Sequence, residues 1–201
     1  GDLVEYGVQP VECVEWVRQH ATAVIRGNHD HSVAQRVPPP IGSGLRGLAG
    51  ATRQQHWKLL SASHLKFLSR LPVSQTLELD GRRFHLVHAT PRDPMDEYLT
   101  HDSSAWKARL AGIGADFVCV GHTHLQFHMD LDPTQLVNPG SVGQPRDGDP
   151  RAAYAIIEDG RVELKRVEYD IDAAAQALQD SGLPGELVEL AAAMLRTGGR
   201  I

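Results

Sequence analysis

The stretch Phe117-Val118-Cys119-Val120-Gly121-His122-Thr123-His124 decides the fold that we expect for this chain. Its first four residues are apolar and a glycine follows them, which is typical of a buried strand. This strand would deliver the imidazoles of His122 and His124 at its carboxyl end. Two histidines one residue apart at a strand end form a metal-ligand arrangement.

Other apolar runs stop in the same way. Ala23-Val24-Ile25 precedes Gly27-Asn28-His29-Asp30, Phe84-His85-Leu86-Val87 precedes His88, and Gly1-Asp2 resembles the end of a further motif. In open α/β sheets, ligands bind beyond the carboxyl ends of the strands. The pattern therefore predicts one crevice that collects the side chains of Asp2, Asn28, His88, His122 and His124.

The composition is that of a globular domain. The chain has 201 residues, of which 41% are hydrophobic and 22% charged, and its formal net charge is −5. This charge argues against general attraction to nucleic acid or to anionic membranes. No apolar run approaches the ~18 residues that span a membrane, and no signal-peptide pattern is present. Cys13 and Cys119 form no CxxC pair and are interpreted as reduced core thiols, so we expect a cytoplasmic protein.

Periodicity and turn signals predict the elements along the chain. We expect helices over 11–20, 52–70 with a break near 61–63, from Asp102 or Ser103 through Leu110, 172–179 and 186–196. We expect strands over 21–26, 75–79, 83–87, 117–120, 127–131, 135–137, 152–158 and 161–169. The dipeptides Asp80-Gly81 and Asp159-Gly160 predict hairpins. Early strands alternate with helices and late strands form hairpins, which indicates an α/β fold with mixed sheets and helices outside.

We expect a single domain over 1–201 with closing helices at 172–201. Residues 37 to 50 carry three consecutive prolines and four glycines, which predicts a loop rather than an element. A segment over 31–52 could act as a flap over the crevice or be a surface loop, and both interpretations stay open.

One carboxylate, one amide oxygen and three imidazoles form a mixed oxygen and nitrogen ligand set. This set suits divalent transition metals, manganese first, with iron, zinc, cobalt or nickel as alternatives. Two such ions about 4 Å apart can clamp a phosphoryl group and make a metal-bound hydroxide available near neutral pH. His29 follows the ligand Asn28 and could protonate the leaving oxygen, with Asp30 orienting it. His29 could also be structural or an extra ligand.

These residues resemble a known family. The segments Gly1 to Gly7, Gly27 to Asp30, Leu86 to His88 and Gly121 to His124 are similar to the successive motifs of the calcineurin-like metallophosphoesterases. The runs His88 to Pro94 and Asn138-Pro139-Gly140-Ser141-Val142-Gly143 are similar to a bacterial and archaeal branch related to diadenosine tetraphosphatases and serine/threonine phosphatases. Four motifs in order form a specific signal.

The resemblance implies a four-layer αββα sandwich with two mixed sheets. It also implies that Asp2 bridges two metals, that Asn28, His88 and His122 complete one site, and that His124 belongs to the other. His29 would be the acid. The family begins with a strand ending in an Asp-x-His motif, and the sequence here shows neither that motif nor the strand-helix-strand unit that carries it.

Three hypotheses follow from this. The first is a metal-dependent phosphoesterase acting on phosphomonoesters or phosphodiesters. The second is a non-catalytic binding scaffold of the same fold with an incomplete metal site. The third is an active enzyme represented without its start. The expected partner is a small-molecule or protein phosphoester, with no general nucleic-acid binding and no membrane, and a homo-oligomer stays open.

Polar residues outside the ligand set have several interpretations. Arg92 and Arg146 could grip a substrate phosphate in bidentate fashion, and Asn138 could also contact substrate. Each could equally be a solvated loop residue. The remaining histidines are assigned to surface or packing positions: His20, His31, His56, His64, His85, His101 and His128.

Overall fold

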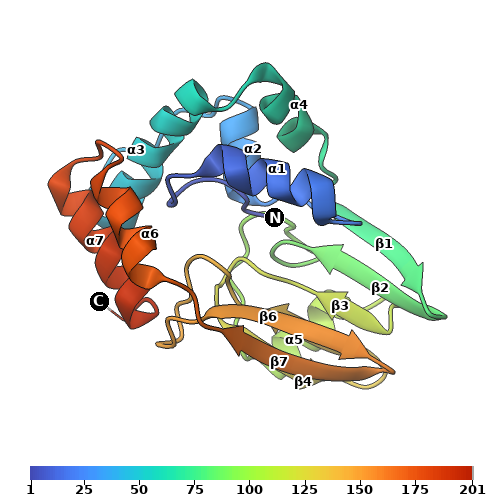
Figure 1. Ribbon diagram of the computed structural model, residues 1–201. Helices are drawn as coiled ribbons and strands as arrows, with labels where there is room; N and C mark the ends of the chain where they lie inside the picture. Colours follow the sequence, from blue (N-terminus) through green and yellow to red (C-terminus); the bar gives the residue numbers. More distant parts are fainter. Residues whose placement is uncertain (201) are drawn as a thin grey trace.

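A computed structural model describes residues 1–200 (Figure 1). Its helices are α1 Pro10–His20, α2 Asn28–Ala34, α3 Gly44–Leu59, α4 Ala62–Arg70, α5 Ser103–Leu110, α6 Ile171–Gln179 and α7 Gly185–Thr197. Its strands are β1 Ser74–Leu79, β2 Arg82–Val87, β3 Phe117–Cys119, β4 Gln126–Asp130, β5 Gln135–Pro139, β6 Ala152–Glu158 and β7 Arg161–Val167. Most of these bounds confirm the elements expected from periodicity and turn signals.

The strands form a five-stranded sheet of order β1-β2-β3-β5-β4 and a two-stranded sheet of β6 and β7. The larger sheet is mixed, because β2, β3 and β5 run parallel while β1 and β4 pair antiparallel to their neighbours. The mixed α/β fold is thus confirmed, although the second sheet is a plain antiparallel hairpin rather than a mixed sheet. The carboxyl ends of β2 and β3 consequently lie side by side.

Helix α5 covers one face of the five-stranded sheet. Its Trp106 and Leu110 pack with Val87, Val118 and Leu136 in a buried apolar cluster. Asp102 caps the helix by accepting a hydrogen bond from the backbone amide of Ala105. Burial of such large side chains stabilises the fold by roughly 1.5–3 kcal/mol each, so this cluster anchors the strands whose ends carry the histidines.

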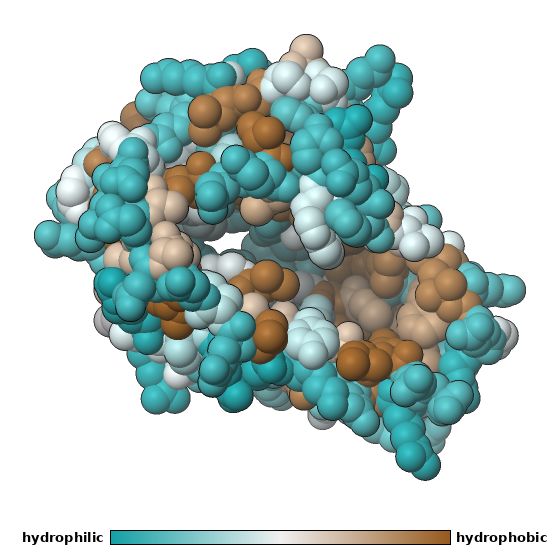
Figure 2. Space-filling view, viewed as in Figure 1, coloured by the Kyte–Doolittle hydropathy of each residue, from teal (hydrophilic) through white to brown (hydrophobic). Residues whose placement is uncertain are grey.

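The remaining helices form an arc around the opposite side of the molecule (Figure 1). One cluster joins α1, α2 and α4 through Val14, Val33 and Leu68, and another joins α3, α6 and α7 through Leu48, Leu178 and Leu187. The N-terminus lies on the inner side, between α1 and the strands. Figure 2 shows a hollow between these helices and the two sheets.

Residues 21–26 correct one expectation. Within residues 1–200 no neighbouring strand pairs with them, so they form no ladder. The backbone amide of Arg26 instead donates to the carbonyl of Pro72 at 2.7 Å. An apolar pattern predicts an extended backbone, whereas a strand also requires a partner.

The loop expected over 37–50 is also wrong in its second half. Helix α3 begins at Gly44, because Leu48 is fully buried against the C-terminal helices and tertiary packing overrides the weak helix propensity of the glycines. Gly47 and Gly50 allow close approach, since a Cβ there would lie 2.6 Å and 2.4 Å from backbone oxygens. The segment 31–52, discussed as a flap, therefore contains two helix ends and a connector over 35–43.

None of the helices within residues 1–200 is long and apolar enough to cross a membrane.

Candidate metal centre

Asp2 is held by backbone groups of the segment that opens α2. Its Oδ1 accepts a hydrogen bond from the amide of His29 at 3.0 Å, and its own amide donates to Asp30 Oδ2 at 2.6 Å. A Cβ on Gly27 would lie 2.0 Å from Asp2 Oδ1, so only glycine permits this approach. The N-terminal segment is thereby fixed beside Asn28 and His29.

His88 and His122 arrive from the parallel pair of strands β2 and β3. His88 follows the last residue of β2, and its carbonyl accepts a hydrogen bond from the amide of Gly121 at 2.8 Å. Ligand atoms of Asp2, His88 and His122 all lie within 4.8 Å of one another, and Nε2 of His88 lies 2.9 Å from Oδ2 of Asp2. The structure thus brings together three of the five residues predicted to meet.

The backbone at these positions is unusual. Asp2, His122 and His124 all have positive φ angles, of 59°, 61° and 60°. Left-handed backbone at a residue other than glycine costs of order 1 kcal/mol and persists only where surrounding structure determines it. A hydrogen bond from the amide of Thr123 to the carbonyl of Gly121 at 2.6 Å closes the turn that carries the imidazoles of His122 and His124.

Three buried donor atoms support a cation at this place. Asn28 Oδ1 is buried without a hydrogen-bond partner, whereas Asp2 Oδ2 and His88 Nε2 are buried and face each other at 2.9 Å. Buried polar atoms are normally satisfied, so these atoms of the N-terminal segment, of α2 and of the residue after β2 require an explanation. A carboxylate, an amide oxygen and imidazoles match the donor set of a divalent transition metal, and the residues present therefore fit one.

The electrostatics favour the metal-binding protonation states. Burial raises the pKa of Asp2, but the imidazoles of His88 and His29 outweigh it and hold the pKa of that carboxyl well below its usual range. Burial and the neighbouring His88 lower the pKa of His122. An ionised carboxylate and a neutral imidazole are the forms that bind a metal.

His124 and Arg146 lie beside this cluster. His124 Nδ1 lies 2.7 Å from the carbonyl of Gln144, so Nε2 is the ring nitrogen that does not take part in this contact. Burial, followed by the charge of Arg146, lowers the pKa of His124 to about 4. The guanidinium of Arg146 stands 6.0 Å from the ring centre of Tyr6, and its Nε is buried without a hydrogen bond. Among residues 1–200, the three-residue cluster around Asp2 does not include His124.

His29 pairs with a carboxylate that sequence reasoning did not single out. Its Nδ1 lies 2.6 Å from Oε2 of Glu5, whose side chain is fully buried. Burial alone would lower the pKa of His29, but the Glu5 hydrogen bond and the charge of Asp2 raise it above its ordinary value. The surroundings of His29 therefore favour its protonated form.

Asp30 does not have the predicted role of orienting His29. Its carboxylate accepts hydrogen bonds from the backbone amides of Asp2, Leu3 and Gly27 at 2.6–2.9 Å. The carboxylate is fully buried and these amides occupy it, so it fixes the backbone rather than the imidazole. Glu5 takes the position beside His29 because the turn at residues 5–7 points its side chain there.

The three residues predicted to contact substrate have different surroundings in the structure. The fully buried Asn138 uses its Nδ2 to donate to the carbonyl of Gly121 at 2.9 Å and to Thr123 Oγ1 at 3.1 Å, so it braces the histidine turn. Arg92 has a 62% exposed side chain and forms an ion pair with Glu97. Of the three residues, only Arg146 lies beside the candidate ligand His124.

Sequence reasoning also missed the residues of α3 that hold the Glu5 turn, namely Thr52, Arg53 and His56. All three are buried polar side chains on a helix, and their spacing i, i+1 and i+4 places them on one face. Only that spacing could have suggested a shared task.

The chain is similar to known proteins in both sequence and structure. The sequence profile described as the calcineurin-like phosphoesterase superfamily domain matches residues 1–160. The chain belongs to that superfamily. An uncharacterised protein of Methanocaldococcus jannaschii is 34% identical over 94% of this chain and 82% of its own length.

Two solved structures and one further relative by sequence are also similar to this chain. A metallophosphoesterase from Sphaerobacter thermophilus has a TM-score of 0.80 and 33% identity, covering 98% of this chain and 86% of that one. A hypothetical protein from Pyrococcus horikoshii has a TM-score of 0.79 at 21% identity, covering 98% and 81%, and so shares the fold. A probable metallophosphoesterase of Mycoplasma pneumoniae is 33% identical over 36% of this chain and 45% of its own length.

Proposed function

We propose that this superfamily member hydrolyses phosphomonoesters or phosphodiesters with the help of divalent transition metals. Asp2, Asn28, His88 and His122 would hold one ion, with manganese as the first candidate. His124, together with Asp2, would hold a second ion. The observation that carries the proposal is the convergence of Asp2, His88 and His122, whose ligand atoms all lie within 4.8 Å of one another.

The bound metals would supply Lewis-acid polarisation of the phosphoryl group and a water of lowered pKa. The protein's own part is to place the phosphate and to move a proton. Arg146 would bind a phosphate oxygen, since its buried Nε has no hydrogen-bond partner and its positive charge acts on the neighbouring candidate ligand His124.

His29 would donate the proton. Its Nδ1–H donates to Glu5, so Nε2 is the nitrogen that can deliver a proton to the leaving oxygen as the phosphorus–oxygen bond breaks. The imidazole is then neutral and still bound to Glu5. A scaffold without catalysis has no chemical need for a histidine with a raised pKa held by a buried carboxylate, so this pair favours the enzyme.

The test is hydrolysis of p-nitrophenyl phosphate and bis-p-nitrophenyl phosphate by the manganese-equilibrated chain, with metal content measured on the same sample. We expect turnover in the wild type and its loss, together with bound metal, in His88→Ala. His128→Ala is the matched control, because His128 is exposed and its ring contacts Gln135, outside the candidate metal centre. Unchanged turnover in a folded His88→Ala chain would refute the proposal.

A further inference from the structure

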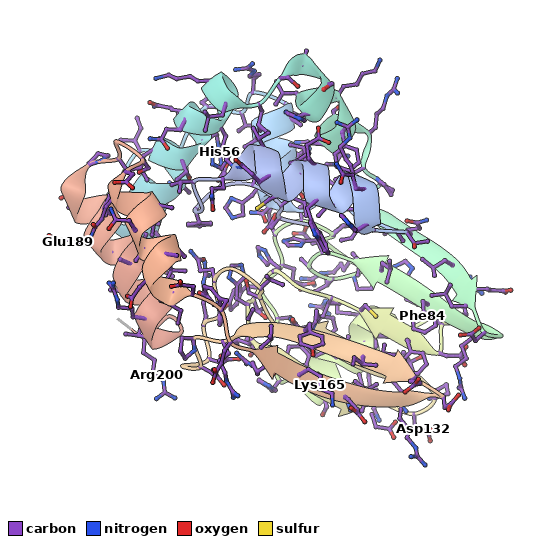
Figure 3. The ribbon with its side chains drawn as sticks, in the orientation of Figure 1. His56, Phe84, Asp132, Lys165, Glu189 and Arg200 are labelled. Carbon is purple, nitrogen blue, oxygen red and sulfur yellow. The ribbon has the colours of Figure 1, made fainter. Side chains whose placement is uncertain are left out.

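Helix α3 holds the turn that carries Glu5 through three neighbouring side chains, which we call the α3 clamp: Thr52, Arg53 and His56. The amide of Tyr6 donates to Thr52 Oγ1 at 3.0 Å, and the amide of Glu5 donates to His56 Nδ1 at 3.1 Å. His56 Nε2 lies 3.0 Å from the carbonyl of Gly7. Figure 3 labels His56, whose ring is thus fixed between α3 and the N-terminal turn.

The clamped turn would not keep its shape without these contacts. Glu5 and Tyr6 have φ angles of 72° and 56°, a conformation that residues with a Cβ rarely adopt. A hydrogen bond of 2.6 Å from the amide of Gly7 to the carbonyl of Glu5 closes the turn. Such backbone persists where surrounding groups specify it, and here those groups come from one face of α3.

Arg53 connects this turn to the segment that leaves α2. Its Nε donates to Glu5 Oε1 at 2.5 Å and its second terminal nitrogen donates to Oε2 at 3.3 Å. The other terminal nitrogen donates to the carbonyls of Val37 and Pro38 at 3.2 and 3.1 Å. The fork of donors therefore fixes Glu5 relative to the connector behind the helix whose first turn carries His29.

Glu5 contacts two partners with its fully buried carboxylate, Arg53 on one side and His29 on the other. We propose that Arg53 is a positioning residue for the reaction: by fixing the Glu5 carboxylate it sets the orientation of the His29 imidazole that protonates the leaving oxygen. This rests on the proposed function. Arg53 itself would contact neither substrate nor metal and would act only through Glu5.

The competing role for Arg53 is structural. Removing one partner of a buried ion pair leaves the other charge buried without a partner, which destabilises the fold. A loss of activity in Arg53→Ala would therefore not distinguish a positioning role from a structural one. Arg53→Lys keeps the charge but loses the rigid fork. The double variant Glu5→Gln with Arg53→Met removes both charges and strands neither.

The matched control is Gln55→Ala. Gln55 lies on the same helix but donates to the carbonyl of Ser181, away from the clamp. All variants are first compared with the wild type for thermal unfolding and for bound manganese.

The first readout needs no metal. A hydrogen bond of 2.6 Å to a carboxylate gives the Nδ1 proton of His29 a downfield NMR signal, assigned by its loss in His29→Gln. We expect this signal in the wild type and in Gln55→Ala. It should broaden or disappear in Arg53→Lys and in the double variant at the same pH.

The second readout compares leaving groups. A p-nitrophenolate leaves without a proton, whereas an alkoxide requires one, so loss of proton donation affects alkyl esters selectively. We expect Arg53→Lys to reduce turnover of a methyl or ethyl phosphoester at least about tenfold more than turnover of the p-nitrophenyl ester. The double variant, which lacks the Glu5 carboxylate itself, should show the same selectivity and sets the upper limit of the loss. Arg53→Gln, which keeps Glu5, decides the question if Arg53→Lys does not fold.

Equal losses on both esters in a folded, metal-binding variant, with the His29 signal intact, would overturn the proposal and leave Arg53 a structural role. If the wild type hydrolyses neither ester, the proposed function fails instead, and the metal-free NMR comparison still decides whether Arg53 orients His29.

Discussion

The two parts of the chain that meet at the candidate metal centre hold their candidate ligands in different ways. The sheet half, residues 74–167, places His88 and His122 at the ends of adjacent parallel strands, where strand register fixes them. The N-terminal half, residues 1–72, places Asp2 through hydrogen bonds to the buried Asp30 carboxylate and to the backbone amide of His29. The difference shows that one site can combine positions set by a sheet with positions set by a polar network.

The largest expected effect comes from removing a ligand in the sheet half. His122→Asn shortens the side chain, and asparagine tolerates the φ of 61° at this position, so the fold should survive. We expect manganese affinity to fall more than about 100-fold, beyond the loss typical of a residue that only supports a ligand. Isothermal titration of the wild type and variant measures this, and unchanged affinity would remove His122 from the ligand set.

The next effect tests the N-terminal half through packing alone. Gly27→Ala would place a methyl group 2.0 Å from Asp2 Oδ1, in a backbone conformation that alanine otherwise accepts. We expect a loss of about 1–3 kcal/mol in the free energy of unfolding together with weakened metal binding. Chemical denaturation measures the first quantity.

Gly143→Ala is the control for this packing test, because no atom lies within 4 Å of a Cβ there. Equal stability of the Gly27→Ala chain and the wild type would show that Asp2 is not fixed in the way that we describe.

A smaller effect concerns acid stability of the metal-free chain. Burial is the first cause that lowers the pKa of His56, and it lowers that of His124 to about 4, so the folded chain protonates these rings less readily than the unfolded chain does near pH 6.5. Stability is therefore complete above about pH 6.5 and falls as the pH drops below it, by up to about 1.4 kcal/mol per pH unit for each group. The raised pKa of His29 has the opposite effect, because the stability that it contributes is present below about pH 6.5 and is lost as the pH rises further.

His56→Gln tests the clamp's share of this dependence. Removing its titration should flatten the slope of unfolding free energy between about pH 6.5 and pH 5, as measured by urea denaturation. A slope identical to that of the wild type would mean that His56 is not held neutral.

The smallest effect is expected at Arg92. Its exposed ion pair with Glu97 should contribute no more than about 1 kcal/mol, and Arg92→Ala should leave metal affinity unchanged. Titration calorimetry together with the melting temperature checks this. A clear rise in the Michaelis constant for a phosphoester would instead restore Arg92 to the substrate contacts that the sequence suggested.

The same comparison explains how much the sequence could predict. In the sheet half, apolar runs that end at His88 and at Gly121-His122 identify strand ends, and parallel strands place such ends together. In the N-terminal half, the pattern of residues 21–26 predicted a strand but contains no information on its partner. The start of α3 at Gly44 depends on packing against α7, which no local propensity encodes.

The roles of acidic residues were the hardest to predict. Asp30 stands beside His29 in sequence, yet backbone amides occupy its carboxylate, whereas Glu5 reaches His29 from 24 residues away. The turn that aims Glu5 depends on side chains of α3 that lie about 50 positions further along the chain, 51 in the case of His56. Distant polar contacts of this kind leave no periodic signal.

The most direct test of the central claim is the anomalous diffraction signal of manganese in crystals of the manganese-equilibrated chain. We predict a peak within roughly 2.0–2.3 Å of Asp2 Oδ2, His88 Nε2 and a ring nitrogen of His122, as expected for direct ligands. A peak elsewhere on the molecule, or full hydrogen bonding of these atoms without a manganese peak between them, would contradict the assignment of this cluster as the metal centre.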